Sequence, residues 1–472
     1  MTSLLILIPL FSVMVLNLPS RTMMRRFAFW LSLILAASQV CLAAFFGTDL
    51  WNNANISGSF FQFNLAVDNL SRVMLFSIGI VVLAAILAGR ELIKDENRQF
   101  NFTNLMLLIL AGMNGVVTTV DVFSLYVFME ITAVASFVLI SLQKDRDALE
   151  ASFKYIIFSA LASVMMLAAI ALLLMVSGET GFPGISHALS NLPTSRLTLL
   201  AVSIFICGLF IKGGAMPFHG WLPDAYSAAP APVSILLAGI VTKTLGIYTL
   251  IRIVGFVLSP NYALNNILLL VGTISIVAGA LAALGQKDLK RMLSYSSISQ
   301  VGYIIIGLGC GTPLGIFGAI FHLFNHSIFK SLLFTNSAAV ESRTNTRNME
   351  ELGGLAERMP CTGTTSIIGF LSAAGIPPLS GFWSKIIIVV ALWQAGFHAY
   401  SAIAVMAGAI TLAYFLSMQR RVFFGKIKEE LKSTKEANFN LLLPALLLAA
   451  ITVGAGILFP FVHDTFITSF FK

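Results

Sequence analysis

The sequence is divided into apolar windows that are each long enough to cross a lipid bilayer, and these windows restrict the fold more than any other feature. A helix of about 20 apolar residues spans about 30 Å of hydrocarbon. About fourteen such windows follow one another, and they begin near residues 2, 27, 70, 102, 122, 152, 197, 231, 263, 290, 313, 361, 402 and 438. We therefore expect an all-α polytopic membrane protein.

The chain has too little polar surface for a soluble protein of its size. Of its 472 residues, 57% are hydrophobic and only 11% are charged, whereas about 25% of the residues in an average soluble protein are charged. The lipid bilayer is the solvent that this composition fits.

The basic residues are divided unevenly between the two sides of the membrane. Cytoplasmic loops of membrane proteins are enriched in lysine and arginine. With the spans numbered in order, the loops after spans 1, 3, 5, 9, 11 and 13 hold twenty of them: Arg21, Arg25, Arg26, Arg90, Lys94, Arg98, Lys144, Arg146, Lys287, Lys290, Arg291, Arg343, Arg347, Arg358, Arg420, Arg421, Lys426, Lys428, Lys432 and Lys435. The opposite side has Arg72, Arg196 and Lys472.

This asymmetry predicts a multi-pass protein of the cell's inner (cytoplasmic) membrane with both termini on the non-cytoplasmic side. It also accounts for most of the net charge of +8, so that we expect no nucleic-acid partner.

The sequence lacks the usual motifs for cofactors and metals. Its four cysteines have no CxxC spacing, which disfavours iron–sulfur ligation and structural zinc. No GxGxxG or Walker pattern opens a βαβ unit. We expect no cofactor, no metal site and no redox centre in this chain, and the sequence leaves open whether the chain takes part in an enzyme.

A few ionisable residues lie inside the apolar windows, where charge is expensive and usually functional. Glu130 is the one acidic residue well within a span. A buried amine loses hydration, whereas a nearby carboxylate stabilises its charged form, so it can gain and lose a proton as its partner moves. Lys212 and Lys243 lie deep in their spans, which favours such a relay. Lys154 and Arg252 lie near span ends, where a structural role is the simpler interpretation.

The segment FHLFNHSIFKSLLF places three titratable residues on one helix face. His322, His326 and Lys330 follow one another at intervals of four residues, which stacks them along the helix. Histidine titrates near physiological pH, so this column suits proton transfer. Each histidine alone could equally be a hydrogen-bonded core residue, and a metal site would need further ligands that the sequence does not offer.

Two spans contain helix-breaking residues, FIKGGAMPFHGWLPDAYSAAPAP in span 7 and FLSAAGIPPLSGFWSK in span 12. Paired interrupted helices in two halves of a transporter indicate inverted repeats that meet at the ion path. With an offset of 160 residues, Phe210 aligns with Phe370 and Pro217 with Pro377. Lys212 then aligns with a serine, so the halves differ chemically.

The breaks divide the chain into four parts: residues 1–101 with helices 1–3, 102–262 as a first inverted repeat (helices 4–8), 263–426 as a second (helices 9–13), and 427–472 with helix 14. Lys385 lies just after the second break. His219 lies inside the first, where it takes part in the relay or caps the break.

Five segments carry a family resemblance: YVFMEITAVASFVLI, IKGGAMPFHGWLPDAYSAAPAPVSILLAGIVTKTLGIYTLIR, KDLKRMLSYSSISQVGYIIIGLG, HLFNHSIFKSLLF and AAGIPPLSGFWSK. Together they resemble the antiporter-like proton-translocating subunits shared by respiratory complex I, membrane-bound hydrogenases and Mrp-type cation/proton antiporters. The resemblance runs from about span 4 to span 13 and is closest to the hydrogenase-type and Mrp-type members. It implies fourteen helices, two inverted five-helix repeats, and broken helices 7 and 12.

The resemblance also implies roles for the intramembrane residues. In such a relay, Glu130 corresponds to the family's helix-5 glutamate, Lys212 to its helix-7 lysine, Lys243 to its helix-8 lysine, His322, His326 and Lys330 to its helix-11 titratable residues, and Lys385 to its terminal helix-12 residue. Some relatives carry glutamate at the last position, which leaves the tuning of the outer gate open. We expect Lys212 to be the cation partner of Glu130.

Three functions remain open from the sequence. The first is a proton-translocating subunit of a multi-subunit membrane-bound oxidoreductase of the complex I-like or hydrogenase type, with other membrane subunits and hydrophilic redox subunits as partners. The second is a subunit of an Mrp-type Na⁺/H⁺ antiporter, with sodium handled elsewhere in the complex because lysines outnumber carboxylates inside the spans. The third, a carrier of an anionic solute, is disfavoured by the relay spacing and the family motifs.

Overall fold

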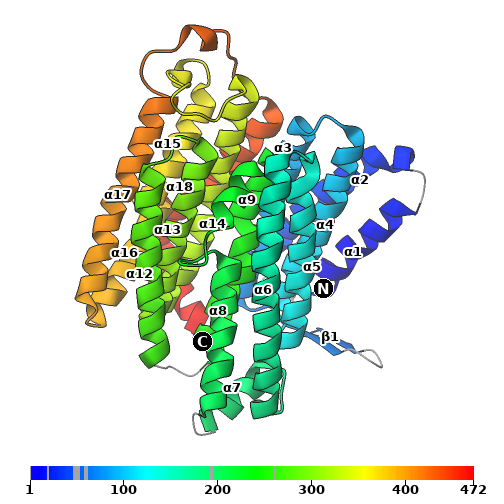
Figure 1. The fold of residues 1–472 in the computed structure, drawn as a ribbon, viewed down its shortest axis with the longest axis vertical. Coiled ribbons are helices and arrows are strands. Elements are labelled where there is room, and N and C mark those ends of the chain that lie inside the picture. Colours follow the sequence, from blue (N-terminus) through cyan, green and yellow to red (C-terminus); the bar gives the residue numbers. More distant parts are fainter. Residues whose placement is uncertain are drawn as a thin grey trace.

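Long helices that run mostly along one axis make up almost all of the computed structural model (Figure 1). The structure describes residues 2–18, 21–45, 54–57, 62–191, 195–258 and 262–471. The helices that match uninterrupted predicted spans are α1 (Leu4–Asn17), α2 (Arg21–Phe45), α3 (Asn69–Leu92), α4 (Glu96–Thr118), α5 (Val122–Ile140), α6 (Arg146–Ser177), α12 (Tyr262–Leu284), α13 (Leu289–Gly309), α14 (Pro313–Thr344), α17 (His398–Val422) and α18 (Phe439–Phe471). The predicted helical membrane fold is confirmed.

The other three predicted spans are interrupted. Span 7 consists of α8 (Arg196–Gly213), a loop and α9 (Leu222–Ala228), and span 12 consists of α15 (Pro360–Ala374) and α16 (Ser380–Gln394). Span 8 contains α10 (Ala231–Leu236), the π-helical segments η3 (Leu237–Val241) and η4 (Lys243–Tyr248), and α11 (Thr249–Phe256). The sequence predicts the breaks in spans 7 and 12 but not the π-helix in span 8.

Within the described residues, eleven helices are long and apolar enough to cross a membrane. The remaining predicted spans fall short of that test for local reasons. α1 has 14 residues, and the two pieces of span 12 have 15 each. α13 is long enough, but its first half, LKRMLSYSSISQ, is polar.

Some helices begin before their apolar windows because the first turn is polar. α6 starts at Arg146, six residues before the predicted window at residue 152. The carboxylate of Asp145 accepts a hydrogen bond from the N–H of Ala148 at 2.8 Å, an N-cap that satisfies an otherwise free backbone donor.

Several short elements connect the spans. The sequence does not predict the helix α7 (Phe182–Asn191) or the antiparallel pair β1 (Ala54–Ser57) and β2 (Gln62–Leu65), in which Ala54 lies opposite Leu65. This pair is a small departure from the expected all-α fold. The described residues also form three 3₁₀ turns: η2 (Ser141–Gln143), η5 (Leu355–Glu357) and η6 (Glu429–Leu431).

Both broken spans end their first helix in the same way. α8 ends before Gly214 (φ 66°) and α15 before Gly375 (φ 86°), a left-handed conformation that glycine adopts readily. The residue after each glycine then donates a backbone hydrogen bond of 3.0 Å to the fifth residue before it.

The matched helix ends lie 161 residues apart, at Gly214 and Gly375. The predicted offset of 160 is therefore wrong by one residue at the breaks. Lys212 corresponds to Ala373 rather than to Ser372, and Pro217 corresponds to Pro378, the second of two consecutive prolines in span 12.

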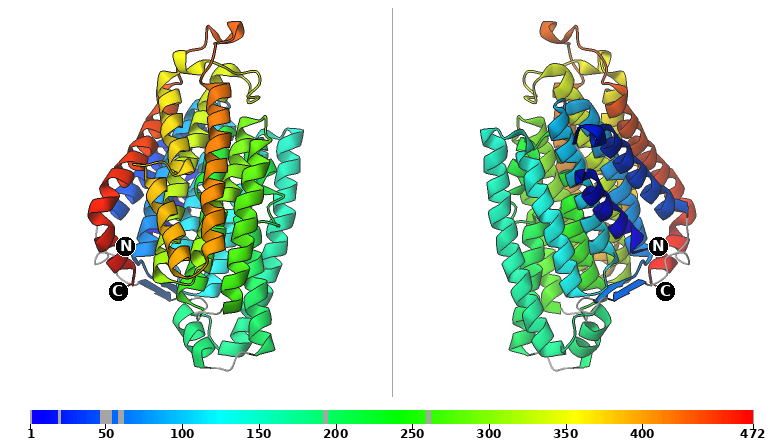
Figure 2. Two further views of the ribbon diagram at one scale, coloured as in Figure 1. Left: turned by 90° about the vertical axis from the view of Figure 1, so that its left-hand side faces the viewer. Right: turned by 90° about the vertical axis from the view of Figure 1, so that its right-hand side faces the viewer.

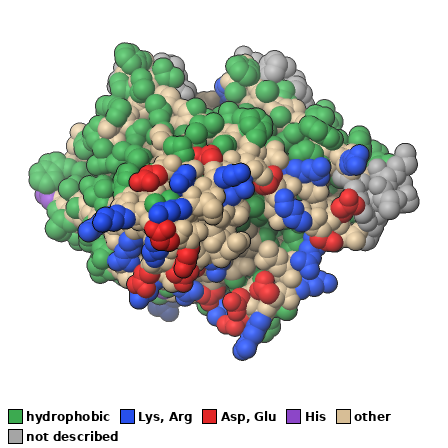
Figure 3. Space-filling model, turned by 90° about the horizontal axis from the view of Figure 1, so that it is seen from above, with side chains coloured by type: hydrophobic (Ala, Val, Ile, Leu, Met, Phe, Trp, Pro, Cys, Tyr) green, Lys and Arg blue, Asp and Glu red, His purple; other side chains and the backbone are tan. Residues whose placement is uncertain are grey.

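Charged side chains gather at one end of the bundle (Figure 3). This charged end carries the α12–α13, α14–α15 and α17–α18 loops, uppermost in Figure 1. The N–H of Met349 donates to the carbonyl of Lys287 at 2.9 Å and joins the first two loops. α7, the strand pair and both ends of the chain lie toward the opposite end (Figure 2); Met1 and Lys472 themselves are outside the described residues.

α14 lies at the centre of the bundle and packs against α3, α10, α13, α15, α16 and α18. All three members of its predicted titratable column are buried. By contrast, α6 exposes large apolar side chains such as Phe153, Leu161 and Val164, as expected for a face toward lipid or a neighbouring subunit. The fold thus places the column in the interior and the apolar surface outside.

Candidate functional site

Glu130 and Lys212 form an ion pair between α5 and α8. The Nζ of Lys212 lies 2.9 Å from Oε1 of Glu130. Two serines of α6 complete the site: Ser163 donates to the same carboxylate oxygen at 2.5 Å, and Lys212 donates to Ser159 Oγ at 2.8 Å. The expected contact between Glu130 and Lys212 is confirmed. The sequence analysis missed the two serines, although their spacing of four residues places them on one face of α6.

The two members of this pair differ in burial. The side chain of Lys212 is 1% exposed, whereas that of Glu130 is 30% exposed at the surface of the chain. The amine therefore depends on this one carboxylate for its counter-charge, and the carboxylate can also meet a group outside the chain.

Lys243 lies at the start of η4 and is fully buried. Its amine donates to the carbonyl of Ala238, and Thr242 Oγ1 is 3.5 Å away. π-Helical turns inside α-helices frequently occur at functional sites. α8 and η4 cross at Gly213 and Gly246, where a Cβ on Gly246 would come within 2.3 Å of the α8 backbone. The helix that carries Lys212 therefore packs directly against the helical segment that carries Lys243.

The column on α14 is assembled as predicted. The rings of His322 and His326 stack with centroids 6.3 Å apart. His322 Nδ1 is 2.9 Å from Ser384 Oγ on α16. Lys330 donates to Ser296 Oγ at 2.7 Å and to the carbonyl of Leu293 at 3.1 Å, both on α13.

Lys385 lies beside the second break. Its amine donates to the carbonyl of Ala373 at 2.6 Å, the residue that corresponds to Lys212 in the first break. The amine also lies 4.4 Å from the ring centroid of Tyr303, which in turn is 5.8 Å from the ring of His322. The Tyr303 ring therefore contacts both Lys385 and the head of the α14 column.

Several buried polar atoms around the column have no hydrogen-bond partner within the described part of the chain. They include Nε2 of His322, both ring nitrogens of His326 and Oγ1 of Thr244. Buried polar groups nearly always find a partner in the protein or in ordered water. This interior is therefore chemically suited to water.

His219 is not brought to these residues. It is partly exposed in the loop between α8 and α9, next to the exposed Gly220. Its Nδ1 is 3.3 Å from the carbonyl of Pro217, and its ring centroid is 6.4 Å from that of Tyr295. The contacts described for it include none of the lysines.

The structure gives Lys154 and Arg252 structural partners. Lys154 lies 2.8 Å from both Glu150 and Asp224. Arg252 contacts Asp68 at the start of α3, at 2.5 Å. Burial raises the pKa of Asp68, but the hydrogen bonds and charge of Arg252 outweigh this effect and lower the pKa to about 2.

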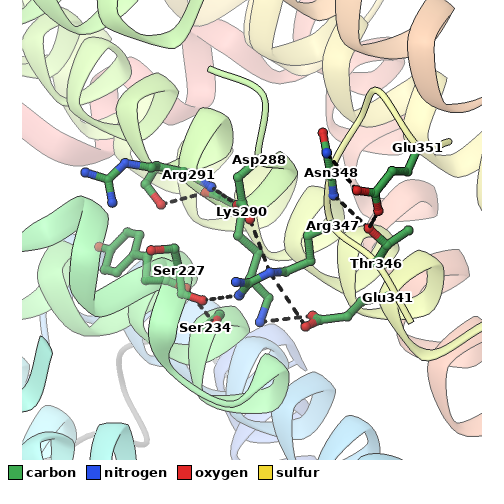
Figure 4. A network of polar contacts seen from close by, with 12 residues as sticks. Ser227, Ser234, Asp288, Lys290, Arg291, Glu341, Thr346, Arg347, Asn348 and Glu351 are labelled. Atoms are coloured by element: carbon green, nitrogen blue, oxygen red, sulfur yellow. Dashed lines mark hydrogen bonds and ion pairs between the residues drawn. The ribbon is translucent and has the colours of Figure 1, made fainter. Parts of the chain in front are cut away.

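Lys290 is a buried amine that the sequence analysis assigned to a loop. It is the second residue of α13, its side chain is 2% exposed, and its Nζ lies 3.1 Å from Glu341 Oε2 on α14 (Figure 4). A signal was available, because Lys290, Ser294 and Ser297 are spaced as one face of a helix. Within the described residues, no three His, Cys, Asp or Glu side chains form a group that could hold a metal ion.

Comparisons with known proteins give a consistent result. Residues 119–411 match the family described as NADH:quinone oxidoreductase/Mrp antiporter, transmembrane. The chain is 33% identical over 398 residues to a Na⁺/H⁺ antiporter subunit of Alkalihalophilus pseudofirmus, covering 83% of this chain and 80% of that protein. It is 33% identical over 405 residues to an NADH-quinone oxidoreductase subunit of Desulforudis audaxviator, with the same coverage.

A solved structure resembles nearly the whole chain. A chain of the membrane-bound sulfane sulfur reductase, an archaeal respiratory membrane complex, superposes with a TM-score of 0.88 and 28% identity, over 99% of this chain and 96% of that one.

Proposed function

The chain belongs to the NADH:quinone oxidoreductase/Mrp antiporter family of membrane subunits, and we propose that it moves protons through its buried amines and imidazoles as part of a multi-subunit membrane-bound oxidoreductase. It has no redox centre of its own in this proposal, so hydrophilic partner subunits carry the electrons. The observation that carries the proposal is the set of buried titratable groups, most of which have only carbonyls and hydroxyls as partners within the part of the chain that the structure describes.

The relay begins at the Glu130–Lys212 pair. While the carboxylate stays within 2.9 Å, it stabilises the charged amine. When the carboxylate moves away, the amine is left in a dry interior with Ser159 and Ser163, and its proton can pass to Lys243. The close crossing of α8 and η4 supports this step.

The proton then crosses to the second half of the bundle. His326 and His322 offer three ring nitrogens that have no partner among the described residues, and water can link these nitrogens to the amines of Lys243 and Lys330. Lys385, beside the second break, is the terminal group, and its contact with the Tyr303 ring connects it to His322. His219 stands outside this path and caps the first break.

The exposure of Glu130 supports a neighbouring membrane subunit as partner. A carboxylate that is 30% exposed on α5 would face hydrocarbon in an isolated chain, at a cost of several kcal/mol. A polar group or water on a partner subunit removes this cost, and its movement can pull on Glu130.

The finer topology belongs to the same proposal. We place the charged end in the cytoplasm and both termini on the other side of the cytoplasmic membrane. We also retain two inverted repeats, residues 102–262 and 263–426, flanked by residues 1–101 and 427–472, with the register of the breaks shifted by one residue. Neither a cofactor nor a metal is part of the mechanism in this chain.

A second candidate function is that of a subunit of an Mrp-type Na⁺/H⁺ antiporter, which is favoured by the 33% identity to the antiporter subunit of Alkalihalophilus pseudofirmus. Lysines outnumber carboxylates among the buried groups, so in that case too this chain carries the proton and another subunit handles sodium. Purification of the intact complex separates the two functions: iron–sulfur subunits select the first, and a set of small membrane subunits alone selects the second.

The relay is tested with Glu130→Gln in the complete complex in proteoliposomes, with a pH-sensitive dye in the lumen. We expect assembly to be retained and driven proton translocation to fall by about a hundredfold, since the switch has lost its charge. Glu150→Gln is the matched control, because Glu150 is exposed and pairs with Lys154 at the charged end. Wild-type translocation in Glu130→Gln would remove this residue from the mechanism.

A further inference from the structure

The chain contains a second lysine–glutamate pair built like the first. In the Lys290–Glu341 pair the lysine side chain is 2% exposed and the carboxylate 32%, against 1% and 30% for Lys212 and Glu130. The distances between amine and carboxylate are 3.1 and 2.9 Å. The two pairs lie in different places: the first joins α5 and α8, and the second joins α13 and α14 at the charged end.

We propose that the Lys290–Glu341 pair is the gate through which protons enter the relay from the charged end. The inference rests on the proposed function and adds the residues of the entrance, which the relay described above lacks. Lys290 releases its proton inward, and this proton reaches the amine of Lys243. A second proton, from water at the charged end, then restores the charge on Lys290.

The carboxylate of Glu341 has two alternative cation partners. Its Oε2 is 3.1 Å from Lys290, and its Oε1 is 3.8 Å from Nε of Arg347. Arg347 is held in place independently, since it contacts Asp288 at 3.2 Å and donates to the carbonyl of Ser227 (Figure 4). A small movement of Glu341 toward Arg347 leaves Lys290 with one acceptor among the described residues, the carbonyl of Ala229 at 3.3 Å.

Glu341 is also reached from outside. An open hollow of about 170 Å³ is lined by Lys290, Glu341, Ser342, Arg347 and the chain around Pro230. Two of its lining side chains are cationic and one is a carboxylate, and several water molecules fit in it. Lys290 is thus buried on one side and open to water through its partner on the other, as an entrance requires.

Polar side chains continue from Lys290 toward Lys243. Ser234 donates to the Ala229 carbonyl, which Lys290 also contacts, at 3.2 Å, and to the Tyr226 carbonyl at 2.8 Å. The hydroxyl of Tyr226 is 2.6 Å from Thr242 Oγ1, which is 3.5 Å from the amine of Lys243. A carbonyl accepts a hydrogen bond but does not pass on a proton, so water must join Lys290 to Ser234. The fully buried ring of Tyr226 then separates Ser234 from Thr242, and this ring is the shutter between the gate and the relay.

The decisive experiment uses Lys290→Arg in the complete complex in proteoliposomes. Arginine keeps the positive charge and can still pair with Glu341, but it does not release its proton in proteins. We expect normal assembly and driven proton translocation lowered by about tenfold or more. Lys287→Arg is the control, because Lys287 is three residues away, 68% exposed and paired with Glu350.

A second variant tests the gate independently, in case the larger arginine side chain cannot be accommodated at position 290. Tyr226→Phe removes one hydroxyl and keeps the ring, and we expect the same direction of effect, with Tyr400→Phe on α17 as its control. Each variant is compared with Glu130→Gln in the same preparation.

The outcomes separate the gate from the proposed function. Loss of translocation in Lys290→Arg or Tyr226→Phe, with both controls active and Glu130→Gln impaired, supports the gate. Wild-type rates in Lys290→Arg and Tyr226→Phe with Glu130→Gln impaired overturn the gate and leave the relay standing. Wild-type rates in all three overturn the proposed function and the gate with it.

Discussion

The buried amine of Lys212 differs in its partners from the buried amines of Lys330 and Lys385. In the first half, Lys212 pairs with a carboxylate and two serines. In the second half, Lys330 and Lys385 contact carbonyls and a hydroxyl, and no carboxylate among the described residues reaches either amine. A buried charge without a counter-charge is costly. The Lys212 site can therefore hold a proton at rest, whereas the Lys330 and Lys385 sites are suited to passing one along.

The largest loss of stability and of proton translocation is expected when the Glu130–Lys212 charge pair is broken. Lys212→Met leaves Glu130 without its cation and should destabilise the protein by up to about 3 kcal/mol, less than for a fully buried pair because the carboxylate is partly exposed. The double variant Glu130→Gln/Lys212→Met should regain most of this stability, because no unpaired charge remains, but not proton translocation.

Thermal unfolding of the purified complex measures the change in stability, and proton uptake reported by a dye measures the change in translocation. A double variant that is as unstable as Lys212→Met would show that packing rather than charge pairing holds this site. One that still pumps would show that the first half needs no switch.

A smaller effect is expected from removing one hydroxyl in each half. Ser296→Ala takes from Lys330 its 2.7 Å partner and leaves one carbonyl, so translocation should fall by about tenfold, the equivalent of one hydrogen bond to a charged group. Ser159→Ala should change it by less than about twofold, because Lys212 keeps Glu130 and Ser163. Equal effects in the two halves, measured as initial rates of proton uptake, would contradict the comparison.

The smallest effect concerns the pair that joins α3 to α11 at the end of the first half. The pKa of Asp68 is lowered from 3.8 to about 2, so its contribution to stability is present above pH 4 and is lost as the pH falls through about 2. Asp68→Asn should therefore lower stability at neutral pH by less than about 1 kcal/mol, since the carboxylate is half-exposed. Its unfolding curve should meet the wild-type curve as the pH approaches 2, and a constant difference at every pH would exclude the charge as the cause.

The site could be predicted where it depends on spacing within one helix or on charge alone. His322, His326 and Lys330 form a column because they follow at the helical period. Glu130 and Lys212 are far apart in the chain, and they could be paired because a lone carboxylate within the spans needs a cation and because the family resemblance gives both residues a place in the relay. The serines on α6 and the buried state of Lys290 were missed, since a hydroxyl or a charge near a helix end is common in sequences and becomes informative only through its neighbours.

The sequence by itself determined that the chain is a helical membrane protein, where most of its spans lie and which ionisable residues lie inside them. Hydrophobicity and helical period are local properties, because each span must be apolar and helical by itself to lie in the bilayer. Only the tertiary structure decided the π-helical turns of span 8, the one-residue shift between the two breaks, the contacts of His219 with Pro217 and Tyr295, and the pairing of Lys290 with Glu341. These depend on which distant helix packs against each residue, and that contact is absent from any single window of the chain.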